Sequence, residues 1–578
     1  MKSLHAYLAL VLLWACVYLP GLGSREIRGE EWRRTLPART MLNTGEWIVP
    51  WSGGLPYVRK PPLILWVNAA SFKLTGVQNE WTARLPGVLL MLGAALGIYA
   101  CSRRFMGNEA AFVGCVFFLT CAGSLEKGRI AEIEVYYIAL TGLAFAAWLA
   151  GFMGKLNRWL AWLIAGFCLG LACLAKGPVH LLFFYFLVIG ACWTTKRWRE
   201  LLSAPHFAGL ALCAGMFLAW GIPFMQRYGQ LIEAQPWLVE AYGRAVAAGA
   251  PAEMPKGAFA SWWHELTSRV TGEEPSSTKD WLVRGPRAIV MFLPWALFIP
   301  WWWKKNVLES AFPDDDKRKV YRGLCWGVVA GFAMMVLLPS SSPRYVAPLF
   351  GPVAVLLGWL VTRQTTYVVR ANTIWRWIAR LAITLSMLVF AIGMFITFAP
   401  PTPALPAGWQ LLVIVIAGVA AFSTYMVRRD GEDWRAPVRS CFLTIGAFAF
   451  LMLAYSWLSP AIYGRKDDIR PTGVAMRDAI QSKDAPLYIF HLGQQPYSFY
   501  LPEDSIELYD LQQLPGAGVR WMLTSKKVSI DFGPWFERRY GATTKVGEWT
   551  GAWGDKDQDE ARNMVLLRFA GRPASVGP

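Results

Sequence analysis

Long apolar runs alternate with short polar segments along most of the chain. A helix that crosses about 30 Å of hydrocarbon needs roughly 20 mostly apolar residues. The pattern therefore predicts an all-α, polytopic membrane protein with about thirteen transmembrane helices. The predicted spans are residues 5–23, 82–101, 109–125, 134–153, 159–175, 178–194, 207–225, 288–303, 320–339, 345–362, 378–398, 409–427 and 439–459.

The first of these runs has the length and the preceding basic residue, Lys2, of a signal peptide. A signal peptide also ends in a cleavage site of small residues, of the A-x-A kind, and no such site follows here. We therefore expect residues 5–23 to be retained as a span.

Three longer polar segments interrupt the apolar runs, at residues 24–81, 226–287 and 461–578. Short cytoplasmic loops of membrane proteins carry an excess of Lys and Arg. If the N-terminus is cytoplasmic, the inside segments carry 22 basic residues. The short outside loops then carry only Lys127, Arg129, Lys176 and Arg344. The count favours a cytoplasmic N-terminus, so the three long segments face the exterior, which in a bacterium is the periplasm.

The last polar segment differs in pattern from the rest of the chain. PTGVAMRDAIQ is typical of a helix, whereas PLYIFHL, RWMLTS and NMVLLRF are short apolar runs bounded by polar residues, as strands are. We expect residues 461–578 to form a small periplasmic α/β domain. Residues 1–460 then form the transmembrane domain.

Composition supports the membrane assignment and excludes several other classes of protein. The chain is 55% hydrophobic and only 17% charged, which rules out a soluble cytosolic enzyme and a disordered chain. Its ten cysteines show no paired CxxC spacing, so we interpret them as small packing residues. The formal net charge of +18 belongs entirely to residues 1–460, because residues 461–578 carry 15 basic and 15 acidic residues.

The first exterior segment is rich in basic residues, on the side where they are normally scarce. Long loops are translocated whatever their charge, which explains tolerance of these residues but not their enrichment. Arg binds phosphate bidentately and Lys binds it as a point charge. We therefore predict a site for lipid phosphates here, partly covered by two interfacial helices at residues 25–44 and 61–74.

Residues 30–63, EEWRRTLPARTMLNTGEWIVPWSGGLPYVRKPPL, resemble the D-E-x-R…A-R-E-M-L…G-D-W-x-V-P…P-Y…E-K-P-P segment of membrane glycosyltransferases of the protein O-mannosyltransferase type. Within that family the chain is most similar to the bacterial transferases that add aminoarabinose to lipid A. The resemblance extends through about residue 360. Further matching segments follow in order: ARLPGVL at 83–89, GRIAEIEVYYIALTGLAF at 128–145, LAKGPV at 174–179, VEAYGR at 239–244 and SSSPRYVAPLFGPVAVLLG at 340–358.

The resemblance implies the GT-C fold and a polyprenyl-phosphate-dependent glycosyltransferase, either a pentosyltransferase or a hexosyltransferase. The expected reaction moves 4-amino-4-deoxy-L-arabinose from undecaprenyl phosphate to a lipid A phosphate at the periplasmic face, a modification that accompanies polymyxin resistance. Transfer of a hexose to protein Ser or Thr is one alternative. A transporter or flippase for a lipid-linked sugar is the other, although a translocation pathway needs charges near mid-membrane and these charges lie in exterior loops.

Breaking the bond between the sugar and its carrier leaves negative charge on a phosphate, which preorganised cations stabilise. Lys60 and Arg244 are the first candidates for phosphate ligands, followed by Arg33 and by Arg344 with Tyr345. The alternative interpretation of Lys60 is a solvated loop cation. For Arg344 the alternative is an interfacial anchor beside Tyr345.

Two glutamates are candidate catalytic acids, Glu30 first and Glu134 second. Such a carboxylate is a general base when the acceptor is a hydroxyl. When the acceptor is a phosphate, it more plausibly orients the donor or pairs with its 4-ammonium group. The alternatives are a helical ion pair of Glu30 with Arg33 or Arg34, and a structural role for Glu134 at a span boundary. Lys176 lies at an exterior helix end before a proline, and the alternative to a functional role for it is that of a snorkelling lysine.

The sequence contains no G-x-G-x-x-G or Walker-type loop, so we expect neither a nucleotide cofactor nor a nucleic-acid partner. HELTSR at 264–269 is not the H-E-x-x-H metalloprotease motif. We expect no cofactor, and a divalent metal remains the alternative. Its possible ligands are His180, His264, Glu31, Glu240 and Glu265.

Overall fold

The computed structural model describes residues 2–27, 29–58, 60–240, 278–339, 341–363, 377, 384, 469–480, 485–492, 496–549 and 563–571. By its contacts the chain divides into two compact units, which are described separately. The first unit comprises Met1–Ser24, Arg84–Ala219 and His264–Ile462. The second comprises Arg25–Ala83, Trp220–Trp263 and Tyr463–Pro578.

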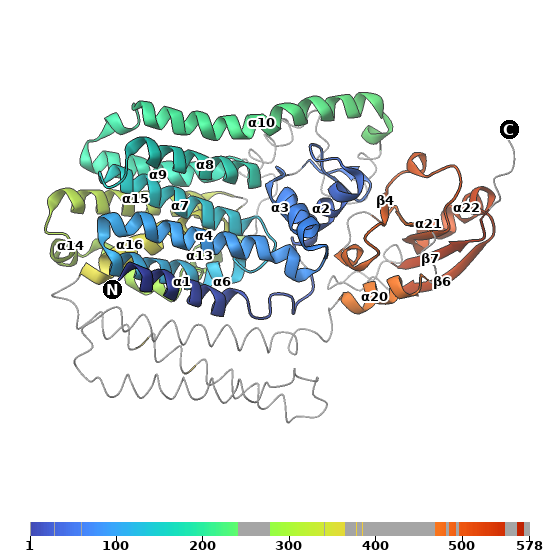
Figure 1. The fold of residues 1–578 in the computed structure, drawn as a ribbon, viewed down its shortest axis with the longest axis horizontal. Helices are drawn as coiled ribbons and strands as arrows, with labels where there is room; N and C mark the ends of the chain where they lie inside the picture. The colour runs from blue at the N-terminus through green and yellow to red at the C-terminus, as the bar shows by residue number, and fades with distance from the viewer. Residues whose placement is uncertain are drawn as a thin grey trace. The chain divides into compact units, whose positions relative to one another are not determined.

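The first unit is a bundle of apolar helices (Figure 1). Its helices, two of which continue into the second unit, are α1 (Ser3–Tyr18), α4 (Glu80–Met106), α5 (Asn108–Thr120), α6 (Ala122–Lys127), α7 (Glu134–Phe152), α8 (Arg158–Lys176), α9 (Val179–Thr195), η1 (Trp198–Glu200), α10 (Ala204–Ala234), α13 (Thr278–Val290), η2 (Trp295–Trp303), α14 (Lys305–Ala311), α15 (Asp315–Leu337), η3 (Pro343–Leu349) and α16 (Phe350–Arg363).

Six helical segments of the described residues are long and apolar enough to cross a membrane: α4, α7, α8, α10, α15, and η3 with α16. Each coincides with a predicted span. Three other predicted spans, 5–23, 109–125 and 178–194, correspond to the shorter apolar helices α1, α5 and α9. The spans predicted at 378–398, 409–427 and 439–459 lie outside the described residues. The chain is thus a multi-pass membrane protein.

The span predicted at 288–303 is not one straight helix. The chain bends by 98° between Asp280–Val290 and Trp295–Trp303. Pro294 stands at this break and has no backbone N–H to donate, so it interrupts the helical hydrogen bonds. The carbonyl oxygens of Met291 and Leu293 accept hydrogen bonds from the first residues of α6 instead. The segment is therefore a broken helix whose bend is fixed by a neighbouring element.

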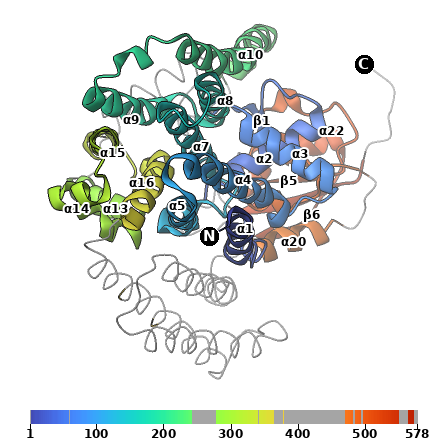
Figure 2. The ribbon, with the colours of Figure 1, turned by 60° about the vertical axis from the view of Figure 1, so that its left-hand side comes forward.

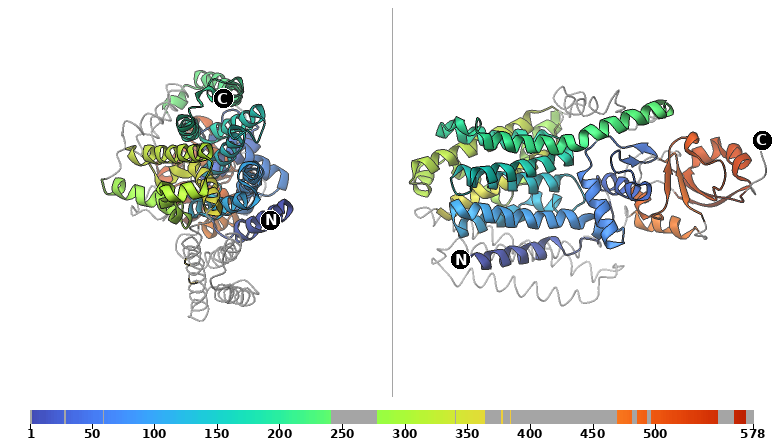
Figure 3. Two further views of the ribbon diagram at one scale, coloured as in Figure 1. Left: turned by 90° about the vertical axis from the view of Figure 1, so that its left-hand side faces the viewer. Right: turned by 45° about the horizontal axis from the view of Figure 1, so that its top comes forward.

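Close approach of small residues packs the bundle. A Cβ atom placed on Gly323 of α15 would lie 2.2 Å from the carbonyl oxygen of Gly190 on α9. Helices in lipid associate through such contacts, because burying apolar surface gives no gain there. Figures 2 and 3 show α7, α8, α9, α15 and α16 side by side in this bundle. Helix α7 is the most enclosed of the six candidate spans among the described residues, with 94% of its apolar stretch buried.

The second unit contains most of the first long polar segment, residues 24–81, and the C-terminal segment. The first contributes α2 (Trp32–Thr44), the hairpin of β1 (Trp51–Ser52) and β2 (Leu55–Pro56), and α3 (Leu63–Thr75). The C-terminal elements are α20 (Arg470–Asp478), β3 (Leu487–Phe490), η5 (Pro496–Tyr500), β4 (Ile506–Leu508), η6 (Leu511–Gln513), β5 (Trp521–Ser525), α21 (Lys526–Asp531), α22 (Gly533–Tyr540), β6 (Thr543–Trp549) and β7 (Met564–Phe569). The strands predicted from PLYIFHL, RWMLTS and NMVLLRF are thus confirmed as β3, β5 and β7.

The C-terminal strands form one mixed sheet of order β4-β3-β5-β7-β6. Strands β4, β3 and β5 are parallel, and β7 runs antiparallel to β5 and β6. Successive side chains of a strand point to opposite faces. Along β7, Val565 and Leu567 enter one hydrophobic cluster, whereas Met564 and Leu566 enter another. Both faces of the sheet are therefore covered.

The prediction of an interfacial surface helix at residues 25–44 is wrong for α2. Leu36 and Met41 are at most 1% exposed, and Arg34 and Arg39 are also buried. The helix packs against α3, β1 and η5 within the second unit, so protein covers the residues that were expected to meet lipid. The second predicted interfacial helix corresponds to α3, whose last turn leaves Leu74 exposed.

Candidate active site

Glu134 is the buried centre of an ion cluster in the first unit. It begins α7 and is 5% exposed. Its Oε1 atom lies 3.0 Å from Nζ of Lys176, the last residue of α8, and 3.6 Å from Nε of Arg344 in η3. Helices α7 and α8 are consecutive and packed against each other, so the start of one meets the end of the other. The fold thus brings together three residues that are far apart in the sequence.

The residues after Lys176 explain why its side chain is presented at this point. Gly177 has a φ of +101°, a conformation that L side chains rarely adopt, and it ends α8. Pro178 follows and precedes the first residue of α9. The hydroxyl of Tyr137 donates a 2.7 Å hydrogen bond to the carbonyl oxygen of Gly177. This bond ties the first turn of α7 to the end of α8.

Aromatic rings complete the cluster around the two cations. Nζ of Lys176 lies 4.3 Å from the ring centroid of Tyr345 and 5.5 Å from that of Tyr137. The guanidinium carbon of Arg344 lies 5.8 Å from the Tyr345 centroid. Cations within about 6 Å of a ring face are stabilised by its quadrupole. Lys176 is therefore held between a carboxylate and two rings, which argues against a snorkelling lysine.

A second carboxylate, Glu132, lies close to this cluster. Its Oε2 atom is 3.2 Å from Nζ of Lys127, which also contacts Glu126 at 3.2 Å. Burial raises the pKa of Glu132 above its ordinary value, Lys127 opposes the shift and the charge of Glu134 adds to it. Glu132 is not among the site residues predicted from the sequence. The E-x-E spacing at the start of a span was the signal that could have identified it.

In the second unit, Glu30 lies just before α2 and binds two arginines of its first turn. Its carboxylate is 2.8 Å from Arg33 and 3.2 Å from Arg34. Arg34 is buried, and its guanidinium also donates a hydrogen bond to the hydroxyl of Tyr57. These are the helical ion pairs that the sequence offered as an alternative for Glu30. Two guanidinium groups thus fix a carboxylate that remains 28% exposed.

The predicted phosphate ligands of the second unit are only partly described. Arg33 is partly exposed, and its guanidinium carbon lies 5.0 Å from the Trp32 ring centroid. Lys60 follows the β1 and β2 hairpin and is half-buried. Arg244 lies outside the described residues. Binding of one donor phosphate by Lys60, Arg33, Arg244 and Arg344 therefore stays a prediction.

The described ranges contain no group of three His, Cys, Asp or Glu side chains placed to hold a metal ion. Two of the residues considered for such a site, His264 and Glu265, lie outside those ranges. His180 is buried with its ring nitrogens 3.1 Å and 3.0 Å from the carbonyl oxygens of Gly177 and Leu169. Its ring thus contacts the backbone of the α8 and α9 corner.

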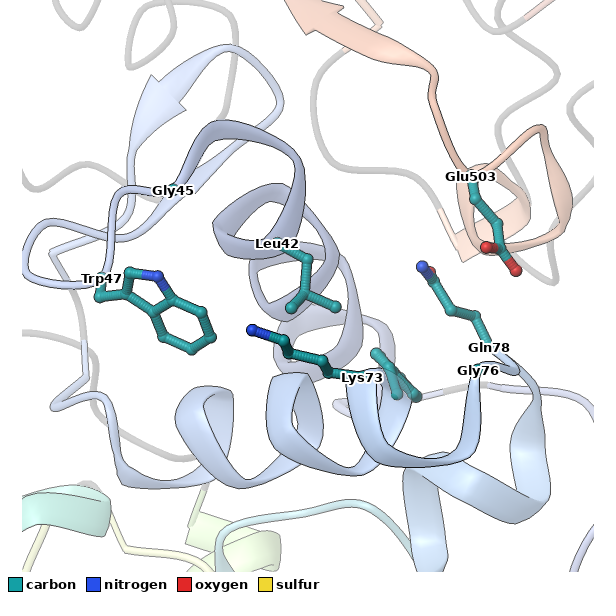
Figure 4. A pocket seen from close by; sticks show the side chains of 8 residues that line it. Leu42, Gly45, Trp47, Lys73, Gly76, Gln78 and Glu503 are labelled. Atoms are coloured by element: carbon teal, nitrogen blue, oxygen red, sulfur yellow. The ribbon is translucent and has the colours of Figure 1, made fainter.

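A cavity of about 500 Å³ opens in the second unit near the ends of α2 and α3 (Figure 4). Lys73 reaches toward the Trp47 indole, and Gln78 faces Glu503 across it. The lining residues are Leu42, Gly45, Trp47, Phe72, Lys73, Gly76, Gln78 and Glu503. These residues do not include Glu30, Arg33 or Lys60, so the cavity is separate from those candidates.

The chain is similar in sequence to several known proteins. Residues 59–222 match the family described as dolichyl-phosphate-mannose-protein mannosyltransferase. An undecaprenyl phosphate-alpha-4-amino-4-deoxy-L-arabinose arabinosyl transferase of Edwardsiella ictaluri is 23% identical over 559 residues, which cover 91% of this chain and 93% of that protein. The protein of the same name from Pseudomonas aeruginosa strain UCBPP-PA14 is 23% identical over 424 residues, which cover 72% of this chain and 70% of that protein.

Structure comparison shows the same fold in ArnT from Cupriavidus metallidurans. The structure of that protein bound to undecaprenyl phosphate covers 100% of this chain and 99% of its own, with a TM-score of 0.64 and 18% identity. Its apo structure has a TM-score of 0.61 at 18% identity, and the match covers 97% of this chain and 96% of that one. The resemblance seen in the sequence is therefore confirmed: this chain is similar in sequence to undecaprenyl phosphate-aminoarabinose arabinosyl transferases and in fold to ArnT.

Proposed function

We propose that this protein is an inner-membrane glycosyltransferase that moves 4-amino-4-deoxy-L-arabinose from undecaprenyl phosphate to a phosphate of lipid A. The observation that carries the proposal is the similarity to an arabinosyl transferase over 91% of the chain. A solved relative of the same fold was crystallised with undecaprenyl phosphate. The fold and the sequence therefore support the same donor.

The chemistry of this transfer suits the candidate residues. The leaving group is a lipid phosphate, so cations at the departing oxygen lower the barrier. We assign this role to Lys60, Arg244, Arg33 and Arg344, with Glu134 and Tyr345 holding Arg344 in place. The acceptor phosphate is already anionic and needs no strong base. Glu30 and Glu134 then position cationic groups, which agrees with their ion pairs.

The topology that goes with this function places the reaction at the periplasmic face. The distribution of Lys and Arg favours a cytoplasmic N-terminus, which puts the first turn of α7 and the last turn of α8 on the outer side. The same count assigns residues 24–81, 226–287 and 461–578 to the periplasm. Donor and acceptor both carry long lipid tails, which accounts for an enzyme embedded in the membrane.

Reconstitution into proteoliposomes tests the proposal. The vesicles contain the full chain, undecaprenyl phosphate-linked aminoarabinose, lipid A and a Ser- and Thr-rich peptide. We expect an aminopentose on a lipid A phosphate and release of undecaprenyl phosphate. Sugar on the peptide would favour the protein O-mannosyltransferase-like alternative. Movement of the donor across the bilayer without transfer would instead support a flippase.

A further inference from the structure

A single buried carboxylate of the C-terminal segment binds two parts of the first exterior segment. Glu507 lies in β4, and its Oε2 atom accepts a hydrogen bond from the backbone N–H of Gly53. Its Oε1 atom lies 4.0 Å from a terminal guanidinium nitrogen of Arg39 in α2. The side chains of Arg39 and Glu507 are 3% and 7% exposed. The carboxylate thus joins α2 to the turn of the β1 and β2 hairpin.

The hairpin turn fits against the end of β4 by backbone shape as well. Gly54 has a φ of +77°, and a Cβ atom there would lie 2.4 Å from the backbone nitrogen of Tyr509. The amide of Gln513 donates a 2.8 Å hydrogen bond to the Gly54 carbonyl oxygen. The turn is therefore held at two consecutive residues, Gly53 and Gly54, by the region around β4.

Helix α2 is held by the same part of the chain. A terminal guanidinium nitrogen of Arg39 donates a 2.7 Å hydrogen bond to the carbonyl oxygen of Ser498. One turn further along, the amide of Asn43 donates a 2.7 Å bond to the carbonyl oxygen of Glu503. The C-terminal segment therefore contacts the second half of α2, away from the end near Glu30.

The two elements joined by Glu507 are the ones that carry the candidate site residues. Glu30 and Arg33 flank the start of α2, and Lys60 follows the hairpin. The hydrogen bond between Arg34 and Tyr57 links the same two elements near these residues. Glu507 and this bond together hold α2 and the hairpin at two points.

We propose that Glu507 and Arg39 are positioning residues through which the C-terminal segment sets the spacing of Glu30 and Lys60 for binding of the donor phosphate. This inference rests on the proposed function. We expect loss of the buried pair to weaken donor binding more than it weakens the fold.

The energetics of the pair favour a geometric role over a stabilising one. Burial raises the pKa of Glu507 in spite of Arg39 and the Gly53 hydrogen bond, and burial lowers the pKa of Arg39 in spite of Glu507. Desolvation therefore outweighs the mutual attraction of the two charges. Buried ion pairs of this kind can often be replaced by apolar residues of similar size at little cost in stability, and one use of such pairs is to fix register.

The test uses the full chain in lipid nanodiscs with the variants E507Q and R39M, singly and together. The matched control is E548Q, the same change in β6 of the same sheet, where the carboxylate pairs with Lys526 and Lys545 at the surface. KM for the donor, KM for lipid A, kcat, the Kd of undecaprenyl phosphate and Tm are measured for each protein. R39K, which keeps the charge, tests for rescue.

We expect each single variant to raise the donor KM and the Kd of undecaprenyl phosphate about tenfold, with the lipid A KM unchanged. The double variant should lose less than the sum of the two single variants, because both changes break the contact between Arg39 and Glu507. R39K should recover part of the loss, and E548Q should match the wild type.

Two results would overturn the inference. Donor KM and undecaprenyl phosphate Kd at wild-type values in E507Q and R39M would do so, whatever their Tm. A fall in kcat that merely follows a fall in Tm would show a structural pair. Failure of the proposed function is separate: the wild type itself would then transfer no aminoarabinose and bind no undecaprenyl phosphate.

Discussion

Glu134 and Lys176 meet across the first residue of α7 and the last residue of α8, with 3.0 Å between the carboxylate oxygen and the ammonium nitrogen. Removing one partner of a buried pair leaves the other charge uncompensated. Glu134 also faces Arg344, so its loss leaves two cations at the end of the bundle.

Replacing Glu134 by alanine should therefore affect both stability and activity. We expect E134A to lose stability by less than the roughly 3–5 kcal/mol of a fully buried pair, because the side chains of Lys176 and Arg344 are 16% and 32% exposed. E134D keeps the charge but withdraws it by roughly 1 Å, for which a loss of about a hundredfold in rate is expected if Arg344 must be held accurately. Tm and the rate of sugar transfer measure the two effects. The control is E126A, which removes an exposed partner of Lys127. Wild-type transfer by E134D would show that Glu134 has only a structural role.

Lys60 is predicted to bind the donor phosphate. K60A should abolish transfer, because it removes the predicted phosphate ligand, while the free energy of unfolding changes by about 1 kcal/mol or less, as for most point mutations. K73A removes an exposed lysine of the same exterior segment and should leave transfer unchanged. The assay follows release of undecaprenyl phosphate. Full activity in K60A would remove the assignment and favour a solvated loop cation.

Gly54 and Gly76 can be compared to test whether the close contact of the hairpin turn at Gly54 matters, with Gly76 as the control. Both have positive φ, +77° and +67°, but only Gly54 has backbone atoms where a Cβ would lie. G76A should cost about 1–2 kcal/mol from the strained φ alone. G54A should cost more and should raise the donor KM, because the hairpin must move away from Tyr509. Equal Tm and KM values in the two variants would show that the contact has no effect.

Glu507 predicts a pH dependence of stability. Its pKa in the folded chain is raised above the ordinary value of 4.5. The stability that this raised pKa gives the folded chain is therefore fully present below pH 4.5 and is lost as the pH rises through the raised value. We expect the Tm of the wild type, relative to E507Q, to fall as pH increases above 4.5. Melting curves of the purified protein across this window measure the difference. A constant difference would show that the carboxylate has the same pKa in the folded and unfolded chain.

Much of the fold followed from the sequence because apolar length is a local property. Nine predicted spans coincide with described apolar helices, and three predicted C-terminal strands are present. The helix in the span predicted at 288–303 is bent because Pro294 breaks it, although the proline was visible in the sequence. The surface helix at 25–44 was wrong because its coverage by α3 and the C-terminal segment depends on tertiary packing.

The candidate site was predictable by residue type but not by partner. Glu134, Arg344 and Tyr345 were chosen individually, and Lys176 was weighed as a snorkelling residue, yet the four lie in one cluster. Only the packing of α7, α8 and η3 reveals this. Glu507 gave no signal at all, because its role depends on contacts across more than 400 positions of the chain, to Gly53 at a separation of 454.

The most direct test of the proposed function is the mass of lipid A from bacteria that lack other aminoarabinose transferases but make the donor. Cells that express the wild-type chain should contain lipid A with an aminopentose on phosphate. Cells that express K60A at equal level should contain unmodified lipid A. Unmodified lipid A in the wild-type cells, with the protein present in the inner membrane, would contradict the proposed function.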